Sequence, residues 1–404
     1  MLKKIFSVVM AVIMALSMLT VAVFATDIGA VSELKFNANG KFRILMINDT
    51  QDVGKNGKKQ LVNFVRTAIE KTKPDMIVFV GDQLSDTYIF PSVEDFKIAI
   101  NNVLGICEEL KIPFAVTMGN HDHDREKTLV EKDQWAELYS RYSYCVNGKA
   151  GGSFGTNFGE TDYFTCNVPI KSSDGSKVAL NVYMMDTNNN KGTNGNKGGY
   201  DGVNPDQVKW YEETSDRLKA ENGGKVVPSL LFQHVPVKEI YGLFKECKWN
   251  TKGSIYSRRD GKWYVLDETK TVPGGQLGEA PCSEDFDTIT GQYQSWLKKG
   301  DIIGAWFAHD HVNTFEGITD EGIRMGYNGG ATFRCYGNGG NRSVRVFDID
   351  ENDVANYQTH LEYYKDICGD STRFFFWDII TPKWLTWIMK VVYFLFGWVI
   401  DIFK

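Results

Sequence analysis

Amide, imidazole and carboxylate side chains are concentrated in one short stretch, residues 118–124, which reads Met-Gly-Asn-His-Asp-His-Asp. This stretch follows an apolar run, residues 112–116, that predicts a buried strand. Loops at the ends of buried strands in α/β proteins hold side chains on a rigid scaffold and leave them accessible. Asn120 and His121 are therefore candidates for chemistry, and we expect polar residues from other strand ends to converge on them.

Four further apolar runs end in the same kind of polar residue. The runs are followed by Asp49 and Gln51 (after 42–47), Asp82 (after 76–80), His234 (after 226–232), and His309 with His311 (after 302–308). A single histidine at such a place is more often a core residue, and a lone Gly-Asp pair is only a turn. Four of the six histidines, however, directly follow apolar runs, which makes chance placement improbable. Carboxylate, amide and imidazole groups are ligands of divalent transition metals, so the set predicts a metal centre.

The segments between these runs predict the elements that position the ligands. Residues 59–71 and 96–110 repeat apolar residues at helical spacing between the first three predicted strands. This alternation predicts a sheet with parallel strands and helices on its faces. Another helix should begin after Asn204, where Pro205 and Gln207 complete a capping box. Residues 241–278 are turn-rich and polar, and we expect an insertion packed near the site.

The order of these motifs resembles that of the calcineurin-like metallophosphoesterases, over roughly residues 41–350. The flanking stretches 199–211, 278–282 and 329–345 are similar to a branch of single-domain plant and fungal phosphatases near the purple acid phosphatases. The resemblance implies an α/β fold, a four-layer α/β/β/α sandwich with two mixed sheets. It also implies two divalent metal ions that hold a hydroxide between them for in-line attack on phosphorus.

The resemblance assigns metal ligands residue by residue. It implies that Asp82 bridges the two metals, that Asp49 and His311 bind one of them, and that Asn120, His234 and His309 bind the other.

The same resemblance implies that His121 acts outside the metal shell, where it protonates the leaving oxygen or stabilises its charge. Asp122 would then orient the His121 ring. Two interpretations of His123 stay open: a contact to substrate, or an exposed loop histidine, which we favour.

The sequence departs from the family pattern at two positions. Gln51 stands where the family usually has a histidine, and Ser85 stands where purple acid phosphatases have a tyrosine ligand. Gln51, or Asp52 beside it, would make the site richer in oxygen ligands. Oxygen ligands favour manganese or ferrous iron over zinc, although a high availability of zinc could override this preference.

Composition and the N-terminus bear on location and partners. The net charge of -6 and the absence of Lys/Arg runs argue against nucleic acid as the main partner. Lys3 and Lys4 precede an uncharged run that ends in small residues at Val23 and Ala25. This pattern predicts a signal peptide, residues 1–25, and an exported protein, extracellular or at the cell surface. A retained membrane anchor is the alternative. The seven cysteines are scattered without CxxC spacing, so their pairing cannot be deduced from sequence.

The C-terminal segment, residues 374–404, differs from the rest of the chain. It is apolar and aromatic except for a narrow polar stripe that includes Lys383, Thr386 and Lys390. An amphipathic helix of this kind must bury its apolar face in a membrane surface or against protein. We favour the membrane slightly, because interface-seeking residues such as Trp384 and Trp387 occur here.

Together these observations predict an exported, metal-dependent phosphomonoesterase that acts on a phosphorylated small molecule or lipid. The first alternative is a phosphodiesterase or pyrophosphatase acting on nucleotides or lipid-linked envelope phosphates, since the motifs do not separate monoesters from diesters. The second is a catalytically weak surface binding protein on the same fold, which Gln51 suggests because it replaces the histidine of the family pattern.

Overall fold

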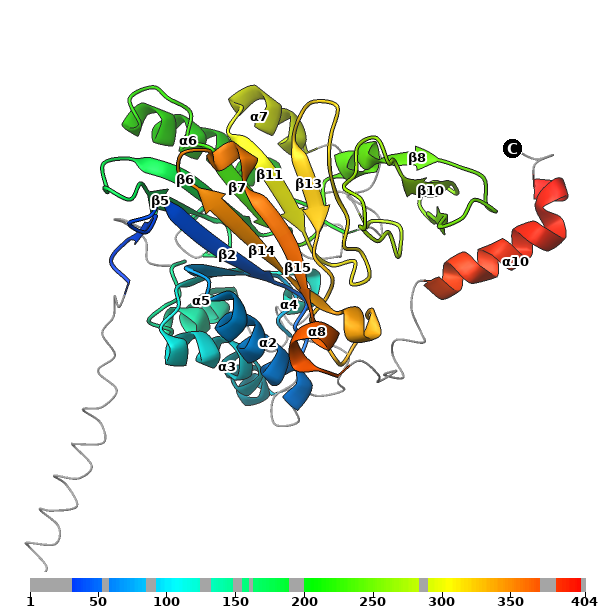
Figure 1. Ribbon diagram of the computed structural model, residues 1–404, viewed down its shortest axis with the longest axis horizontal. Coiled ribbons are helices and arrows are strands. Elements are labelled where there is room, and N and C mark those ends of the chain that lie inside the picture. The colour runs from blue at the N-terminus through cyan, green and yellow to red at the C-terminus, as the bar shows by residue number, and fades with distance from the viewer. Residues whose placement is uncertain are drawn as a thin grey trace, which may run out of the picture.

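Two mixed β-sheets lie face to face at the centre of the molecule (Figure 1). The structure is a computed structural model, and it describes residues 31–52, 58–84, 92–123, 132–147, 155–159, 163–188, 200–282, 290–370 and 383–400. The predicted signal peptide and Ser85 lie outside the described residues.

The five-stranded sheet has the order β15-β14-β2-β3-β4. Its strands are β2 (Lys41–Ile47), β3 (Met76–Val80), β4 (Phe114–Thr117), β14 (Ser343–Asp350) and β15 (Gln358–Tyr363). Strands β2, β3 and β4 are parallel, and helices α2 (Lys59–Thr72) and α3 (Val93–Leu110) connect them. Strands β14 and β15 are antiparallel to their neighbours. The carboxyl ends of β2, β3 and β4 therefore meet at one edge of this sheet.

The seven-stranded sheet has the order β1-β5-β6-β7-β11-β13-β12. Its strands are β1 (Leu34–Lys35), β5 (Cys166–Lys171), β6 (Val178–Met185), β7 (Ser229–Gln233), β11 (Ile302–Phe307), β12 (Glu316–Ile318) and β13 (Arg324–Tyr327). Strands β6, β7, β11 and β13 are parallel. Helices α6 (Pro205–Glu221) and α7 (Gln292–Lys299) lie on the outer face of this sheet (Figure 1).

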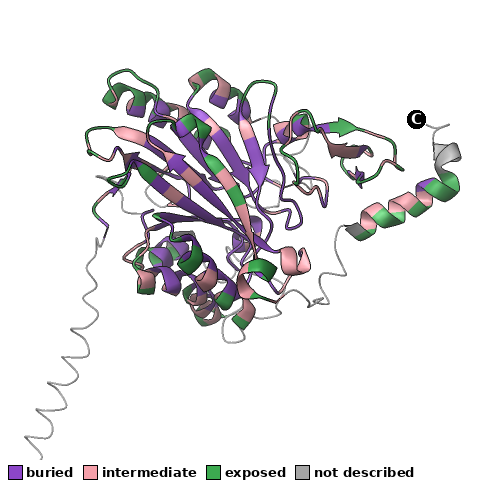
Figure 2. Cartoon of the chain, in the orientation of Figure 1, coloured by how far each residue is buried: buried purple, intermediate pink, exposed green. Residues whose placement is uncertain are grey.

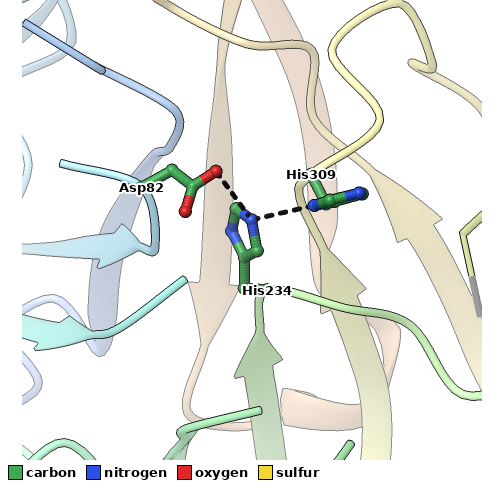
Figure 3. A group of neighbouring side chains, drawn as sticks. All are labelled: Asp82, His234 and His309. Atoms are coloured by element: carbon green, nitrogen blue, oxygen red, sulfur yellow. Dashed lines mark hydrogen bonds and ion pairs between the residues drawn. The ribbon is translucent and has the colours of Figure 1, made fainter. Parts of the chain in front are cut away.

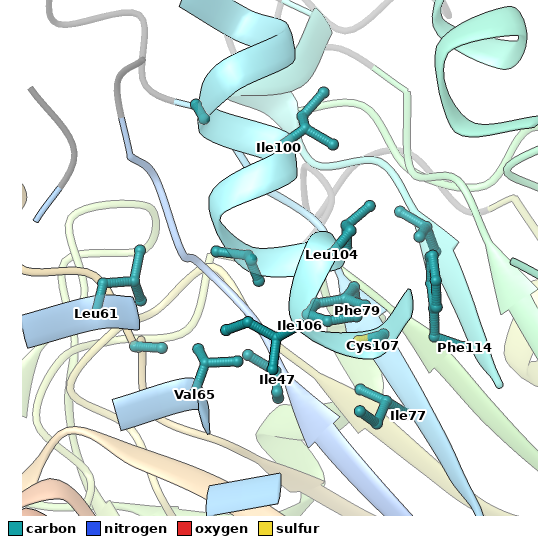
Figure 4. Packing of buried hydrophobic residues seen from close by; sticks show 14 of the residues in the cluster. Ile47, Leu61, Val65, Ile77, Phe79, Ile100, Leu104, Ile106, Cys107 and Phe114 are labelled. Carbon is teal, nitrogen blue, oxygen red and sulfur yellow. The ribbon is translucent and has the colours of Figure 1, made fainter. Parts of the chain in front are cut away.

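The hydrophobic core lies in three layers, which separate four layers of secondary structure. On β2, Leu45 and Ile47 face α2 and α3, whereas Ile44 and Met46 face the other sheet. Figure 4 shows the layer under the helices, and Figure 2 shows that the strands are buried along most of their length. A strand buried on both faces is apolar at every position, which explains the continuous apolar runs. The predicted four-layer α/β/β/α sandwich is confirmed.

The helix starts depend on capping boxes. The Asn204 side-chain oxygen Oδ1 accepts hydrogen bonds from the backbone N–H groups of Asp206 and Gln207 (3.1 and 3.0 Å), as the sequence predicts. Helix α3 begins earlier than residue 96 because Ser92 and Asp95 form a second capping box. Both helices thus begin where side chains satisfy free backbone N–H groups.

The segment predicted as a turn-rich insertion contains a small sheet. After the 3-10 helix η3 (Lys238–Leu243), strands β8 (Phe244–Glu246), β9 (Ile255–Tyr256) and β10 (Trp263–Leu266) pair in the order β8-β10-β9. Helix α10 (Lys383–Ile400) packs on this sheet at the edge of the molecule (Figure 1). Among the described residues, no helix combines the length and hydropathy needed to cross a membrane.

All seven cysteines fall within described residues, and none of them forms a disulfide.

Candidate metal centre

Polar residues from both sheets meet where parallel strands end. Asp49 and Gln51 follow β2, and Asp82 follows β3. Asn120 follows β4 and begins the short helix α4 (Asn120–His123). His234 follows β7 and His309 and His311 follow β11 of the other sheet. The carboxyl ends of parallel strands are the usual place for sites in α/β folds, because several elements deliver side chains there.

The backbone at these strand ends is unusual. Asp49, Gln51, Asp82 and His309 all have positive φ, at 49°, 35°, 51° and 70°. Non-glycine residues seldom adopt this left-handed conformation, and such residues cluster at functional sites where surrounding structure holds them. The fold therefore accepts backbone strain to turn these side chains toward one another.

Two imidazoles and one carboxylate form the tightest group (Figure 3). His234 Nε2 lies 3.2 Å from Asp82 Oδ2 and 3.2 Å from His309 Nδ1. One ligand atom from each of these three residues lies within 4.8 Å of the others. Asn120 belongs to the same group, since its Oδ1 is 2.8 Å from His309 Nδ1. Asp82, Asn120, His234 and His309 are thus brought together as the sequence predicts.

Asp49 and His311 form the neighbouring group. His311 Nε2 lies 3.2 Å from Asp49 Oδ1, which is 3.9 Å from His234 Nε2. The other ring nitrogen of His311 lies 2.8 Å from the Tyr336 carbonyl oxygen, and His234 Nδ1 lies 3.0 Å from that of Val80. A donated hydrogen bond at Nδ1 leaves Nε2 as a lone-pair donor, which is how metal-binding histidines are oriented.

Gln51 points into this site and has a spare oxygen. Its Nε2 donates to Asp82 Oδ2 (3.1 Å), while its buried Oε1 has no hydrogen-bond partner among the described residues. Asp52 is engaged elsewhere, because its carboxylate accepts hydrogen bonds from Arg334 and from the Lys58 backbone. Gln51 rather than Asp52 therefore offers an oxygen to the site.

The charges within the site are strongly coupled. Burial opposes charge on His234, yet the carboxylates of Asp82 and Asp49 raise its pKa to about 9. Burial and the neighbouring His234 lower the pKa of His309 to about 3. Burial raises the pKa of Asp82, but the attraction of His234 and His121 outweighs it and leaves the pKa well below the usual value. A cationic centre would let these buried carboxylates stay charged.

These residues fit divalent metal ions. Two carboxylates, three imidazoles and two amides converge within one buried region, and their types match first-row transition metals. One buried oxygen, Gln51 Oε1, accepts no hydrogen bond within the described structure, and Asp49 Oδ1 faces ring nitrogens of His311 and His234. Buried polar atoms are rarely left without partners, so the Gln51 oxygen indicates that the site is built to bind a cation.

His121 and Asp122 are placed differently from each other. The His121 backbone donates to Asp82 Oδ1 (2.8 Å), which holds His121 at the edge of the metal centre. The Asp122 carboxylate instead accepts three backbone hydrogen bonds, from Gly119, Gln83 and Leu84. None of these three bonds joins Asp122 to the His121 ring, so they do not test the expected role of Asp122 in orienting that ring. Asp122 ties the loops after β3 and β4 together.

His123 is buried, so its interpretation as an exposed loop histidine is wrong. Only 4% of the residue is exposed, and its Nε2 lies 2.9 Å from Asp186 Oδ1. Asp186 follows β6 and is itself fully buried. Sequence analysis missed Asp186 as part of the site region, although it follows an apolar run in the same way as the predicted ligands.

Two tyrosines, each from a stretch that resembles the phosphatase branch, pack on histidines of the predicted ligand set. The Tyr336 ring stacks on His311 at 4.4 Å, and its hydroxyl donates to the buried Glu279 (2.9 Å). The Tyr200 ring packs edge-on against His309 at 4.5 Å. Neither tyrosine follows an apolar run, so the sequence marked their stretches, 199–211 and 329–345, through the family resemblance but gave neither residue a role.

Comparisons with known proteins agree with this geometry. The chain is 27% identical over 347 residues to probable inactive purple acid phosphatase 29 of Arabidopsis thaliana, covering 79% of each chain. It is 27% identical over 356 residues to probable inactive purple acid phosphatase 14 of the same plant, covering 81% of this chain and 80% of the relative. Phosphatase DCR2 of Saccharomyces cerevisiae is 24% identical over 378 residues, which span 86% of this chain and 57% of the yeast protein.

The family model for calcineurin-like phosphoesterases matches residues 42–313, which include every strand end that supplies a predicted ligand. With the two-sheet fold and the converging carboxylates, amides and histidines, this match places the chain in the calcineurin-like phosphoesterase family.

Proposed function

We propose that this protein is an exported phosphomonoesterase that depends on two divalent metal ions. The observation that carries the proposal is the convergence of Asp82, His234 and His309, with the unpaired Gln51 oxygen beside them. Asp82 would bridge the ions, Asp49 and His311 would hold one, and Asn120, His234 and His309 would hold the other. Bound there, the ions would activate water and offset the charge of the phosphoryl oxygens.

The chain's own residues would position the substrate and move the proton. His121 lies at the edge of the ligand group through its backbone bond to Asp82, within reach of a leaving oxygen. Gln51 gives the site one more oxygen ligand where the family pattern has an imidazole. Oxygen-rich sites favour manganese or ferrous iron over zinc.

Hydrolysis of p-nitrophenyl phosphate tests the proposal directly. Asp82→Asn and His121→Ala should each lower kcat/KM by at least about 100-fold with manganese present, since each removes a group that acts in the reaction. His360→Asn is the matched control, because His360 lies on β15 with a half-exposed side chain. Addition of a chelator should abolish turnover. Wild-type rates in the Asp82 and His121 variants would rule out the assignment.

The C-terminal helix supports a second candidate, hydrolysis of lipid-linked phosphates or diesters at a membrane surface. Thr386 Oγ1 accepts a hydrogen bond from the Tyr256 backbone (3.3 Å), and the Tyr393 ring packs on Trp263 at 5.6 Å. The side of α10 that carries Thr386 and Tyr393 thus contacts strands β9 and β10. Other aromatic side chains of α10 are largely exposed, with Trp387 at 64% and Phe394 at 74% exposure, although the Phe394 ring also lies 6.5 Å from that of Trp249. An outward aromatic face is suited to a lipid interface.

Vesicle sedimentation tests this location. Full-length protein should sediment with vesicles that contain anionic lipid, since α10 carries Lys383 and Lys390 and no acidic residue. The double variant Trp384→Ser/Trp387→Ser should reduce the bound fraction at least about fivefold. Both tryptophan side chains are more than half exposed, so they are available to the lipid and their loss should not disturb packing. Equal sedimentation of both proteins would argue against membrane association. Bis-p-nitrophenyl phosphate, compared with the monoester in the same samples, separates diesterase from monoesterase activity.

A catalytically weak binding protein is the remaining candidate. Its support is Gln51 in place of histidine, together with relatives whose names include "probable inactive". Metal content of the purified protein separates this candidate from the first. Two metal ions per chain under manganese saturation, with turnover, support an enzyme; fewer than two without turnover support a binding role.

A further inference from the structure

One arginine of the insertion stands beside the candidate metal centre. Arg259 lies in the turn between β9 and β10, and its guanidinium carbon is 6.0 Å from the centre of the Tyr200 ring. Tyr200 in turn packs edge-on against His309, with ring centres 4.5 Å apart. Tyr200 therefore lies between a metal-binding histidine and an arginine that belongs to no metal-ligand motif.

Arg259 has an unbalanced positive charge. It is exposed, and no carboxylate of the described residues lies within salt-bridge distance of it. Among the described residues the neighbouring Asp260 forms no ion pair with it, and the Asp260 carboxylate instead accepts hydrogen bonds from the Tyr264 hydroxyl and from the Lys262 backbone. An arginine without a counter-ion at the edge of a site is a ready partner for an anion.

The turn that carries Arg259 is held in place from both sides. Ser257 donates its backbone N–H to Lys262 (2.9 Å) and accepts one from Gly261 (3.0 Å), which closes the hairpin. Below the turn, Trp263 is buried at 4% exposure and packs against Tyr256 and against Tyr393 of α10. The insertion therefore presents Arg259 from a fixed base rather than from a free loop.

We propose that Arg259 and Tyr200 form a second anion-binding subsite, and that the preferred substrates are phosphoesters whose leaving group carries another anionic group. This inference rests on the proposed function. With the phosphoryl group held beside His309, the body of the leaving group would cross the Tyr200 ring. Its carboxylate or second phosphate would then reach the Arg259 guanidinium.

The geometry of this surface agrees with the placement. The centre of the Tyr200 ring lies 4.5 Å from that of the His309 ring and 6.0 Å from the Arg259 guanidinium carbon. The surface between His309 and Arg259 combines an aromatic ring with a cation, a pairing suited to a flat or apolar body with a charged end.

Binding of two matched phosphonates to the full-length, manganese-loaded protein tests the subsite without requiring turnover. The probes are phenylphosphonate and 4-phosphonobenzoate, which differ by one carboxylate on a rigid ring. Calorimetry should show that 4-phosphonobenzoate binds the wild type about tenfold more tightly than phenylphosphonate does. This factor is at the low end of the range for a charge-assisted hydrogen bond, because Arg259 is exposed. Arg259→Gln should reduce that preference to less than about twofold.

Arg258→Gln is the matched control, because Arg258 is an exposed arginine in the same turn without a contact to Tyr200. It should keep the preference of the wild type. Equal affinity of the wild type for both probes, equal loss in both arginine variants, or binding of neither probe would overturn the subsite. Hydrolysis of phenyl phosphate separates the two proposals. If 4-phosphonobenzoate is preferred through Arg259 but phenyl phosphate is not hydrolysed, the proposed activity fails while the subsite stands.

Discussion

Two positions at the candidate metal centre, Gly81 and Gly119, have no room for a side chain. A Cβ atom at Gly119 would lie 2.2 Å from Asp82 Oδ1 and 2.5 Å from the Asp82 backbone nitrogen. A Cβ at Gly81 would lie 2.3 Å from His234 Nδ1. The glycines that precede Asp82 and Asn120 are therefore needed because a ligand occupies the space that a side chain would take.

Gly119→Ala tests this argument. The added methyl group must displace Asp82, so we expect metal affinity and kcat/KM to fall by at least about 100-fold, as the reacting geometry is lost. Gly242→Ala is the control, since a Cβ there meets no atom within 4 Å. Both variants should fold, as judged by circular dichroism. Metal content by atomic absorption gives the measurement, and wild-type metal content in Gly119→Ala would contradict the steric explanation.

The site also predicts how stability depends on pH in protein stripped of metal. The pKa of His234 is raised from about 6.5 to about 9, and that of His311 is raised as well. Stabilisation from the protonated His234 ring is complete below pH 6.5 and is lost as pH rises through 9. The melting temperature in chelator should therefore fall between pH 6.5 and 9.

His234→Asn should reduce that fall, because asparagine does not titrate. With manganese present, the wild type should instead become more stable over the same range, since metal ligands must lose their protons to bind. Differential scanning fluorimetry at several pH values measures all three cases. A melting temperature of the wild type in chelator that does not change from pH 6.5 to 9 would contradict the assigned shifts.

The elements that carry the ligands were predictable because they are buried on both faces. Strands β2, β3, β7 and β11 appear in the sequence as apolar runs, and the next polar residue falls at the site. Strand β15 was not predicted, since it lies at a sheet edge and none of its residues is buried. The strands of the insertion were missed for a similar reason: β9 has two residues and β10 is mostly half-buried.

The predicted ligands converge, but their contacts beyond the metal centre depend on packing between distant segments. No pattern in the sequence indicates that Asp186 meets His123, or that Tyr200 lies between His309 and Arg259. Each of these contacts joins residues that belong to separate elements, and no local period relates their positions. The open choice between Gln51 and Asp52 likewise required the tertiary contact of Asp52 with Arg334.

The His123–Asp186 pair joins two secondary-structure elements, so breaking it should lower the stability of the fold. His123 ends α4, which follows the five-stranded sheet, and Asp186 follows β6 of the seven-stranded sheet, so the pair joins loops of both sheets. Asp186→Ala would remove the buried carboxylate that His123 contacts and should lower the free energy of unfolding by about 3 kcal/mol. Asp348→Ala, which breaks the more exposed pair with Arg43, should cost less than about 1 kcal/mol. Urea unfolding of both variants measures the difference; equal losses would show that the buried pair has no special role.

At the scale of the whole molecule, α10 contacts the insertion and lies away from β2 and β3, which carry predicted ligands (Figure 1). Removal of the chain after Asp370 should therefore leave kcat/KM for phenyl phosphate within about twofold of the full-length value.

The same truncation uncovers Trp263, whose ring packs on Tyr393 and lies 6.0 Å from Lys390 Nζ. Loss of these contacts should loosen β9 and β10, because exposed short strands are the least stable parts of a fold. Hydrogen exchange should accelerate at least about tenfold in residues 255–266 and stay unchanged in β2 and β3. Equal acceleration in β2 would mean that α10 stabilises the entire fold, and unchanged exchange in 255–266 would mean that it does not support the insertion.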